Sequence, residues 1–211
     1  MPIRSGRLER TEQHAIAMAQ PEREETSPLA QVVAAARECF ARLGVHRTRM
    51  DDVAAAAGTA RTSIYRRVSS RDELVELALL ERCREFSEEL RAGTDVEADD
   101  LRKELVDLVI RSIAIGRGDE EFSYLVEALP RRLGSFLTGP GSPMHQIVFD
   151  TFAPLIVRGR ERGIIREDAS DHDIVEWTQG IITLFAPRDD LSDFEERRRI
   201  RMFLIPAVFA R

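Results

Sequence analysis

Signals that start helices recur along this chain from Ser27 onward, and they constrain its fold more than any other feature. Ser27-Pro28 and Ser142-Pro143 each place a hydroxyl before a proline, an arrangement that opens helices. A hydroxyl residue followed three positions later by an acid can satisfy the free N–H groups of a first turn. Such pairs are Thr48/Asp51, Ser70/Glu73, Thr94/Glu97, Ser170/Asp173 and Ser192/Glu195. Because no run of alternating β-branched residues competes with these signals, the chain is predicted to be all-α.

The apolar periodicity between these signals predicts about nine helices. They span residues 28–43, 49–57, 60–66, 71–91, 97–116, 120–128, 143–162, 171–186 and 193–209. Three short helices precede the longer ones, which indicates a small head on a helical body. We expect a flexible arm over 1–26, a head over 27–87 with a helix-turn-helix at about 49–68, and a body over 88–211.

Composition argues against a membrane protein and against a metal or disulfide framework. No apolar run approaches the roughly 18 residues of a membrane-spanning helix, and the N-terminus lacks the apolar core of a signal peptide. A cytoplasmic location without a membrane partner is therefore expected. Cys39 and Cys83 have no second ligand at metal-binding spacing. We interpret both as buried apolar side chains, with a redox switch as the alternative.

The sequence gives no positive support for catalysis. Neither a nucleophile motif nor a phosphate-binding loop is present, and the histidines are scattered: His14, His46, His145 and His172. We therefore predict that the chain is not an enzyme and has no metal or cofactor.

Charge is unevenly distributed along the chain, whose net charge is −6. Residues 28–75 carry 8 arginines against 5 acidic side chains, whereas residues 76–211 carry 19 basic against 27 acidic ones. A basic head on an acidic body is expected if only the head meets phosphates.

The predicted head contains a helix that could lie against DNA. Residues 50–57 are followed by Gly58 and a short helix, and two helices joined by a tight glycine turn form a helix-turn-helix. On a helical wheel Ile64 can pack inward, while the other side bears two guanidinium groups, a hydroxyl and a phenol, which suit base edges and the sugar-phosphate backbone. The side chains on that side are Arg61, Thr62, Tyr65 and Arg66. The alternative is an ordinary solvated helix, which the glycine turn and the neighbouring caps disfavour.

The segment from residue 44 to 74 resembles the signature of the tetracycline-repressor (TetR) family of regulators. The Ala-Gly turn at 57–58, the Ile-Tyr pair at 64–65 and the Ser-Arg-Asp-Glu-Leu entry at 70–74 stand at the family's spacing. The likeness is continuous from residue 29 to 75. It departs at 67–68, where Arg-Val stands in place of the family's aromatic or histidine followed by phenylalanine.

The resemblance implies roles for individual residues of the head. Tyr65 and Arg71 are expected to bind backbone phosphates, and Thr48 to hold a phosphate where its helix begins. Arg61 is expected to make a bidentate contact to guanine. The complete predicted DNA-binding set is Thr48, Arg49, Arg61, Thr62, Tyr65, Arg66 and Arg71.

The resemblance also implies a homodimer that binds a near-palindromic operator of double-stranded DNA. This dimer is expected to act as a repressor and to be released from the operator by a small-molecule effector. The body is expected to hold the effector in a region that contains Phe86, Leu108, Phe122, Tyr124, Phe149, Phe152 and Trp177, for each of which plain core packing is the alternative. The dimer is expected to form through the last two helices, where Gly180 permits close contact, by way of Ile174, Ile181, Phe185, Ile200, Phe203 and Leu204. A regulator of the same fold whose body binds a protein or no ligand is the remaining alternative.

Overall fold

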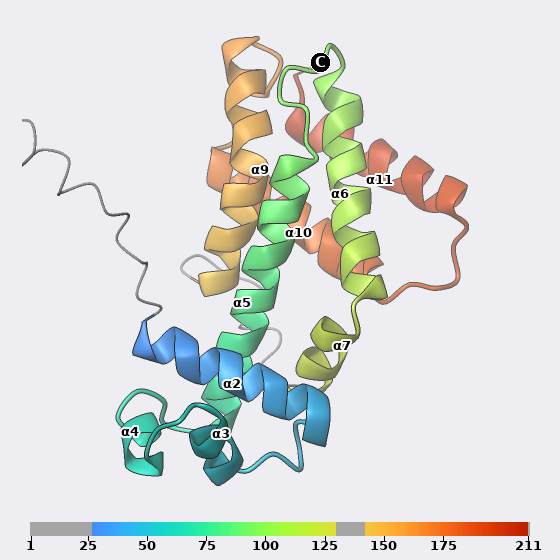
Figure 1. Cartoon of the computed structure of the whole chain (residues 1–211). Coiled ribbons are helices and arrows are strands. Elements are labelled where there is room, and N and C mark those ends of the chain that lie inside the picture. Colours follow the sequence, from blue (N-terminus) through green and yellow to red (C-terminus); the bar gives the residue numbers. More distant parts are fainter. Residues whose placement is uncertain (1–26, 130–141, 211) are drawn as a thin grey trace, which may run out of the picture.

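The computed structural model describes residues 27–129 and 142–210, and within these ranges it contains nine helices and no β-strand (Figure 1). The helices are α2 (Pro28–Leu43), α3 (Met50–Ala56), α4 (Arg61–Tyr65), α5 (Arg71–Ala92), α6 (Leu101–Gly118), α7 (Glu120–Glu127), α9 (Pro143–Glu161), α10 (Asp171–Phe185) and α11 (Asp193–Val208). The all-α prediction is confirmed. The arm predicted over 1–26 lies outside the described residues. In the described part of the chain, no helix combines the length and the apolar character needed to cross a bilayer.

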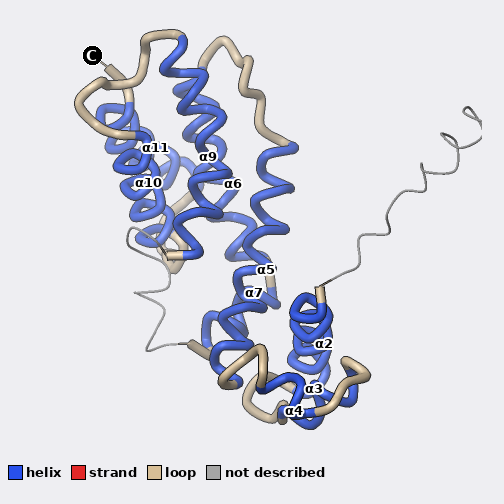
Figure 2. Tube along the Cα trace, turned by 90° about the vertical axis from the view of Figure 1, so that its left-hand side faces the viewer, coloured by secondary structure: helices blue, strands red, loops and turns tan. Residues whose placement is uncertain are grey.

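Helix α5 runs through the molecule and connects its two ends. Its first turns lie with α2, α3 and α4 at one end, and its last turns lie beside α6 and α9 at the other (Figures 1 and 2). We call α2–α4 with the first turns of α5 the head, and the remainder the body. The short helix α7 lies near the junction of the two, packed on α5.

Two clusters of buried apolar side chains hold these parts together. The head cluster includes Phe40, Ile64 and Leu74, and it continues into the body through Leu125 of α7 and Ile147 of α9. The head is therefore not packed in isolation, since body residues complete its core. The body cluster lies between α6, α9, α10 and α11, around Leu108, Phe152, Ile156, Ile200 and Leu204.

Serine side chains cap most of the predicted helix starts. Each accepts a hydrogen bond from the backbone N–H three residues later, at distances between 3.0 and 3.3 Å. These serines are Ser27, Ser70, Ser142, Ser170 and Ser192.

Two predicted caps are wrong, because each threonine side chain is turned back toward the carbonyl four residues earlier and does not accept a hydrogen bond from the first turn of the next helix. Thr94 donates to Leu90 at 2.6 Å, so α6 begins later, at a cap formed by Asp100. Thr48 donates to Gly44 at 2.9 Å, and α3 begins after Arg49 instead.

The turn between α3 and α4 requires a glycine. Gly58 has φ of +60°, a left-handed conformation that side chains with a Cβ rarely adopt. The N–H of Thr59 then donates to the carbonyl of Ala54 at 3.0 Å and closes the end of α3. This turn sets α4 across the end of the head, where it faces away from the body (Figure 1).

Candidate nucleic-acid interface and ligand cavity

Helix α4 presents its polar side to solvent. Ile64 is buried in the head cluster, and Val68, which follows the helix, is buried beside it. A helix of five residues makes little more than one turn, so this anchor fixes which groups face outward. The side chains exposed on the other side are Arg61, Thr62, Tyr65 and Arg66. The protomer itself therefore leaves this side of α4 uncovered.

Two neighbours hold the guanidinium of Arg61 in place. Its Nη1 donates to both carboxylate oxygens of Asp51 on α3, at 2.8 and 3.1 Å, and its Cζ lies 5.4 Å from the ring centroid of Tyr65. Hydrogen bonding to Tyr65 and to Asp51 raises the pKa of Arg61 above its usual value. Sequence reasoning assigned Asp51 to a capping pair, because the approach of α3 to α4 has no signature in the sequence.

The other predicted DNA contacts differ in accessibility. Arg49 is exposed, and Arg71 is half-buried with its Nη1 donating to the carbonyl of His46 at 3.3 Å. Thr48 is only 3% exposed, and its hydroxyl is turned inward to Gly44. The hydroxyl of Thr48 therefore supports the loop inside the head, which corrects the expectation that it reaches a phosphate.

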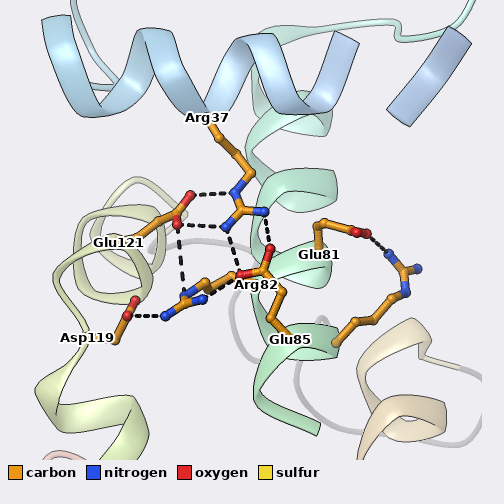
Figure 3. Close-up of polar contacts among 7 residues, drawn as sticks. Arg37, Glu81, Arg82, Glu85, Asp119 and Glu121 are labelled. Atoms are coloured by element: carbon orange, nitrogen blue, oxygen red, sulfur yellow. Dashed lines mark hydrogen bonds and ion pairs between the residues drawn. The ribbon is translucent and has the colours of Figure 1, made fainter. Parts of the chain in front are cut away.

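A cluster of five charged side chains joins the head to the body (Figure 3). Arg37 of α2 binds Glu85 of α5 at 2.5 Å and Glu121 of α7 at 2.6 Å, and Arg82 of α5 binds Glu85 at 2.5 Å and Asp119 at 2.6 Å. We call these residues the junction cluster. The hydrogen bond from Arg37, followed by that from Arg82, lowers the pKa of Glu85 despite its partial burial. Sequence reasoning missed this cluster because its members come from three segments that are distant in the chain, with 37 to 84 positions between partners in different segments.

The body contains a cavity of about 760 Å³ between α5, α6, α7, α9 and α10. Its wall is largely apolar, and its aromatic members are Phe86, Phe122 and Phe152. The rings of Phe86 and Phe122 lie 5.8 Å apart. A cavity of this size, with a few polar groups in an apolar wall, has the dimensions of a small-molecule site.

Four residues of the predicted pocket region do not line this cavity. Leu108 is buried in the body cluster, and Tyr124 packs against the head cluster. Phe149 stacks on His172, with ring centroids 4.3 Å apart, and Trp177 is exposed on α10. Residue type alone could not tell which side of each helix faces the cavity.

The predicted dimer residues also need correction. Phe203 is 62% exposed, but the other five are buried within the protomer's own body cluster. Those five are Ile174, Ile181, Phe185, Ile200 and Leu204. The wide apolar stripes of α10 and α11 therefore face the interior of the protomer. The large apolar side chains that these helices expose are Trp177, Leu184, Phe194, Met202 and Phe203.

Together, the fold and these sites define an all-helical protein with a helix-turn-helix head and a hollow helical body. Residues 32–78, which run from α2 into α5, match the bacterial regulatory proteins of the tetR family. The resemblance inferred from the sequence is thereby confirmed. The family consists of regulators and not of enzymes, in agreement with the prediction. No curated relative matches the chain by sequence.

Solved structures with this fold cover most of the chain. A protein of Shewanella sp. PV-4 assigned to the tetR family of transcription regulators is 16% identical with a TM-score of 0.57, over 88% of this chain and 100% of its own. FadR of Bacillus subtilis, solved with stearoyl-CoA, is 18% identical with a TM-score of 0.53, over 83% and 96%. SmeT, the repressor of the multidrug efflux pump SmeDEF of Stenotrophomonas maltophilia, is 20% identical with a TM-score of 0.51, over 86% and 90%. These likenesses establish the fold of a TetR-type regulator.

Proposed function

We propose that the chain is a dimeric, DNA-binding transcription regulator of the cytoplasm, which represses from a near-palindromic operator until a small molecule releases it. The observation that carries this proposal is the uncovered polar side of α4. Ile64 anchors that helix, and the guanidinium groups of Arg61 and Arg66 face outward with Tyr65 between them. Guanidinium groups bind guanine edges in the major groove, and phenols bind phosphates.

Charge supports the same assignment. The head segment 28–75 carries 8 arginines against 5 acidic side chains, whereas the rest of the protein is acidic. The phosphates of a duplex would thus attract the head and repel the body, which favours one orientation of approach.

The apolar surface of α10 and α11 supports a two-fold dimer. Trp177 and Leu184 are 55% and 63% exposed and lie on one side of α10, with Gly180 between them. Exposed large apolar side chains that cluster on a protein surface mark interaction sites. A two-fold dimer would set two heads about 34 Å apart, the spacing of successive major grooves.

The cavity supports control by a small molecule. It borders α5, which also carries the head, so a ligand that favours one position of α5 would alter the spacing of the two heads. FadR was solved with stearoyl-CoA and SmeT with triclosan, so proteins of this fold do accommodate small molecules. A tenfold loss of DNA affinity on ligand binding requires about 1.4 kcal/mol of coupling free energy.

DNA binding is tested by selecting binding sequences from a random duplex pool with the full chain. We expect a near-palindromic motif. Arg61→Ala should cost about 1–3 kcal/mol and relax the preference at one position of each half-site. Arg71→Ala should weaken binding to all DNA sequences alike, and it should reduce the slope of log affinity against log salt concentration by about one. The proposal fails if no sequence is enriched, or if the two variants behave identically.

Ligand control is tested by thermal stabilisation of the full chain with a broad panel of small molecules, followed by DNA binding with each compound that stabilises it. We expect at least one compound to raise the melting temperature and to weaken operator binding. If no compound stabilises the chain, the result favours a regulator whose body binds a protein or no ligand.

A further inference from the structure

The hydroxyl groups in the cavity wall already donate their protons to backbone carbonyls. Ser112 donates to the carbonyl of Leu108 at 2.8 Å, and Ser123 donates to that of Asp119 at 2.8 Å. Thr183 donates to the carbonyl of Gln179 at 2.9 Å. A hydroxyl has one proton and two lone pairs. Each of these groups can therefore accept a hydrogen bond from a ligand, but it can donate one only by giving up its bond to the helix.

Two buried hydroxyls in the same wall also use their protons within the protein. The oxygen of Thr151 lies 2.8 Å from the carbonyl of Ile147 and 2.7 Å from the oxygen of Ser87. A carbonyl only accepts, so the proton of Thr151 goes to Ile147 if both contacts are hydrogen bonds. The proton of Ser87 then goes to Thr151. Both residues line the cavity between α5 and α9. Each hydroxyl oxygen can still accept a hydrogen bond from a ligand, but neither has a proton left to donate.

The charged groups of the described wall do not favour an anion. Arg117 donates through Nη2 to Glu196 and to the carbonyl of Phe185, both at 2.6 Å, and through Nε to the carbonyl of Ala186 at 3.0 Å. Because Glu196 is buried, it matches the charge of Arg117 within the protein. Glu127 adds a further carboxylate to the wall. Gln179 contributes an amide, which can both donate and accept and so does not distinguish between ligands.

We propose that this cavity takes a largely apolar molecule that carries hydroxyl or amine groups, and that it discriminates against carboxylates and phosphates. The inference rests on the proposed control by a small molecule, and it specifies the chemical class of that molecule. An apolar ligand part would lie against Phe86, Phe122 and Phe152, while its N–H or O–H groups would meet the acceptors of Ser87 and Thr151. Beside Ser87 and Thr151 a carboxylate would lose its hydration and would face acceptors in place of donors, which is costly in an apolar wall.

The test uses four compounds of equal chain length, decanol, decylamine, decyl methyl ether and decanoate, and measures their affinity for the full chain by calorimetry. Decanol and decylamine should bind at least about tenfold more tightly than decanoate or the ether, a difference of about 1.4 kcal/mol. The ether tests hydrogen-bond donation, because it keeps the decyl chain and the oxygen but carries a methyl group in place of the hydroxyl proton. Equal or tighter binding of decanoate overturns the proposal.

A double variant, Ser87→Ala with Thr151→Val, removes the buried acceptor pair. In this variant the ratio of the affinity for decanol to that for the ether should fall close to one, while both compounds still bind. The matched control is Thr178→Val, since Thr178 is a buried threonine of α10 that donates to the carbonyl of Ile174 at 2.7 Å and does not line the cavity. The control should keep the full preference. An unchanged preference in the double variant contradicts the assignment.

The outcomes separate this inference from the proposed function. If none of the four compounds binds while the broad panel contains one that does, the assigned chemical class is wrong and control by a small molecule stands. If no compound of any class stabilises the chain, the proposed ligand control fails, and the inference fails with it.

Discussion

The guanidinium of Arg82 lies over the ring of Phe86, with its Cζ atom 4.6 Å from the ring centroid. Phe86 lines the cavity, and the same guanidinium binds Glu85, which also holds Arg37 of α2. One side chain thus contacts both the cavity wall and the charges that fasten the head. A displacement of Phe86 would therefore act on Arg82 and, through Arg82, on the junction cluster.

Arg37→Gln should loosen the head from the body. The side chain of Arg37 is 19% exposed, and the substitution leaves the carboxylates of Glu85 and Glu121 short of one cation. We expect a loss of about 1–3 kcal/mol in the free energy of unfolding, measured by urea denaturation. Arg84→Gln is the matched control on α5, because Arg84 is 52% exposed in its pair with Glu81 and should cost less than about 0.5 kcal/mol. Equal losses in the two variants would contradict a structural role for the cluster.

The stabilisation by Arg37 should disappear in acid. The hydrogen bond from Arg37 holds the pKa of Glu85 below its ordinary 4.5 in the folded state. A depressed folded-state pKa contributes stability that is complete above the unfolded pKa and is lost as the pH falls through the folded value. The difference in unfolding free energy between the wild type and Arg37→Gln should therefore be constant from about pH 7 to 5 and shrink below about pH 4. A difference that persisted undiminished to about pH 3 would rule out this origin.

Local signals predicted the helices well, because a capping serine and the apolar period act within one or two turns. Relations between distant residues were not predictable in this way. Arg37 and Glu121 are separated by 84 positions, and no pattern in the sequence joins them. The apolar stripes of α10 and α11 were visible, but a stripe does not tell whether it faces its own protomer or a second copy. Ile200 proved to be interior, whereas Trp177, assigned to the cavity from its residue type, is on the surface.

Neither cysteine should react with a thiol reagent in the folded protein. Both are buried, and burial raises the pKa of Cys83 to about 12 and that of Cys39 above its usual value. At about pH 8 roughly one Cys83 side chain in ten thousand is then a thiolate, the reactive form. We expect no labelling by dithionitrobenzoate in the native state and labelling of both thiols in guanidinium chloride. Rapid labelling of either thiol in the native protein would instead favour a redox switch.

Asp51→Asn should lower sequence preference while raising affinity for unrelated DNA. The carboxylate of Asp51 accepts two hydrogen bonds from Nη1 of Arg61 and so fixes the orientation of this exposed guanidinium. Its loss frees the guanidinium to rotate and removes a negative charge from the side of the head that we propose meets phosphates. We therefore expect the preference at the base position assigned to Arg61 to fall by about threefold to tenfold. Asp72→Asn is the matched control, because its carboxylate lies 3.8 Å from Arg71 and does not contact Arg61. Asp72→Asn should raise the affinity for all DNA sequences and leave the sequence preference unchanged. If Asp51→Asn gave this same result, Asp51 would not orient Arg61.

Gly180→Ala should weaken the proposed dimer without weakening the protomer. A Cβ at Gly180 would meet no atom within 4 Å inside the protomer, and alanine in place of a helical glycine adds about 0.5–1 kcal/mol of stability. Trp177 and Leu184 flank this position on the exposed side of α10, so a second copy packed there would meet the added methyl group. We expect the dimer dissociation constant to rise by about tenfold, measured by sedimentation equilibrium. Gly118→Ala, at the end of α6 and equally open, is the control and should leave the constant unchanged. If Gly180→Ala also left it unchanged, the partner would have to bind a different surface, since a close helix pair cannot absorb a methyl group on its axis of contact.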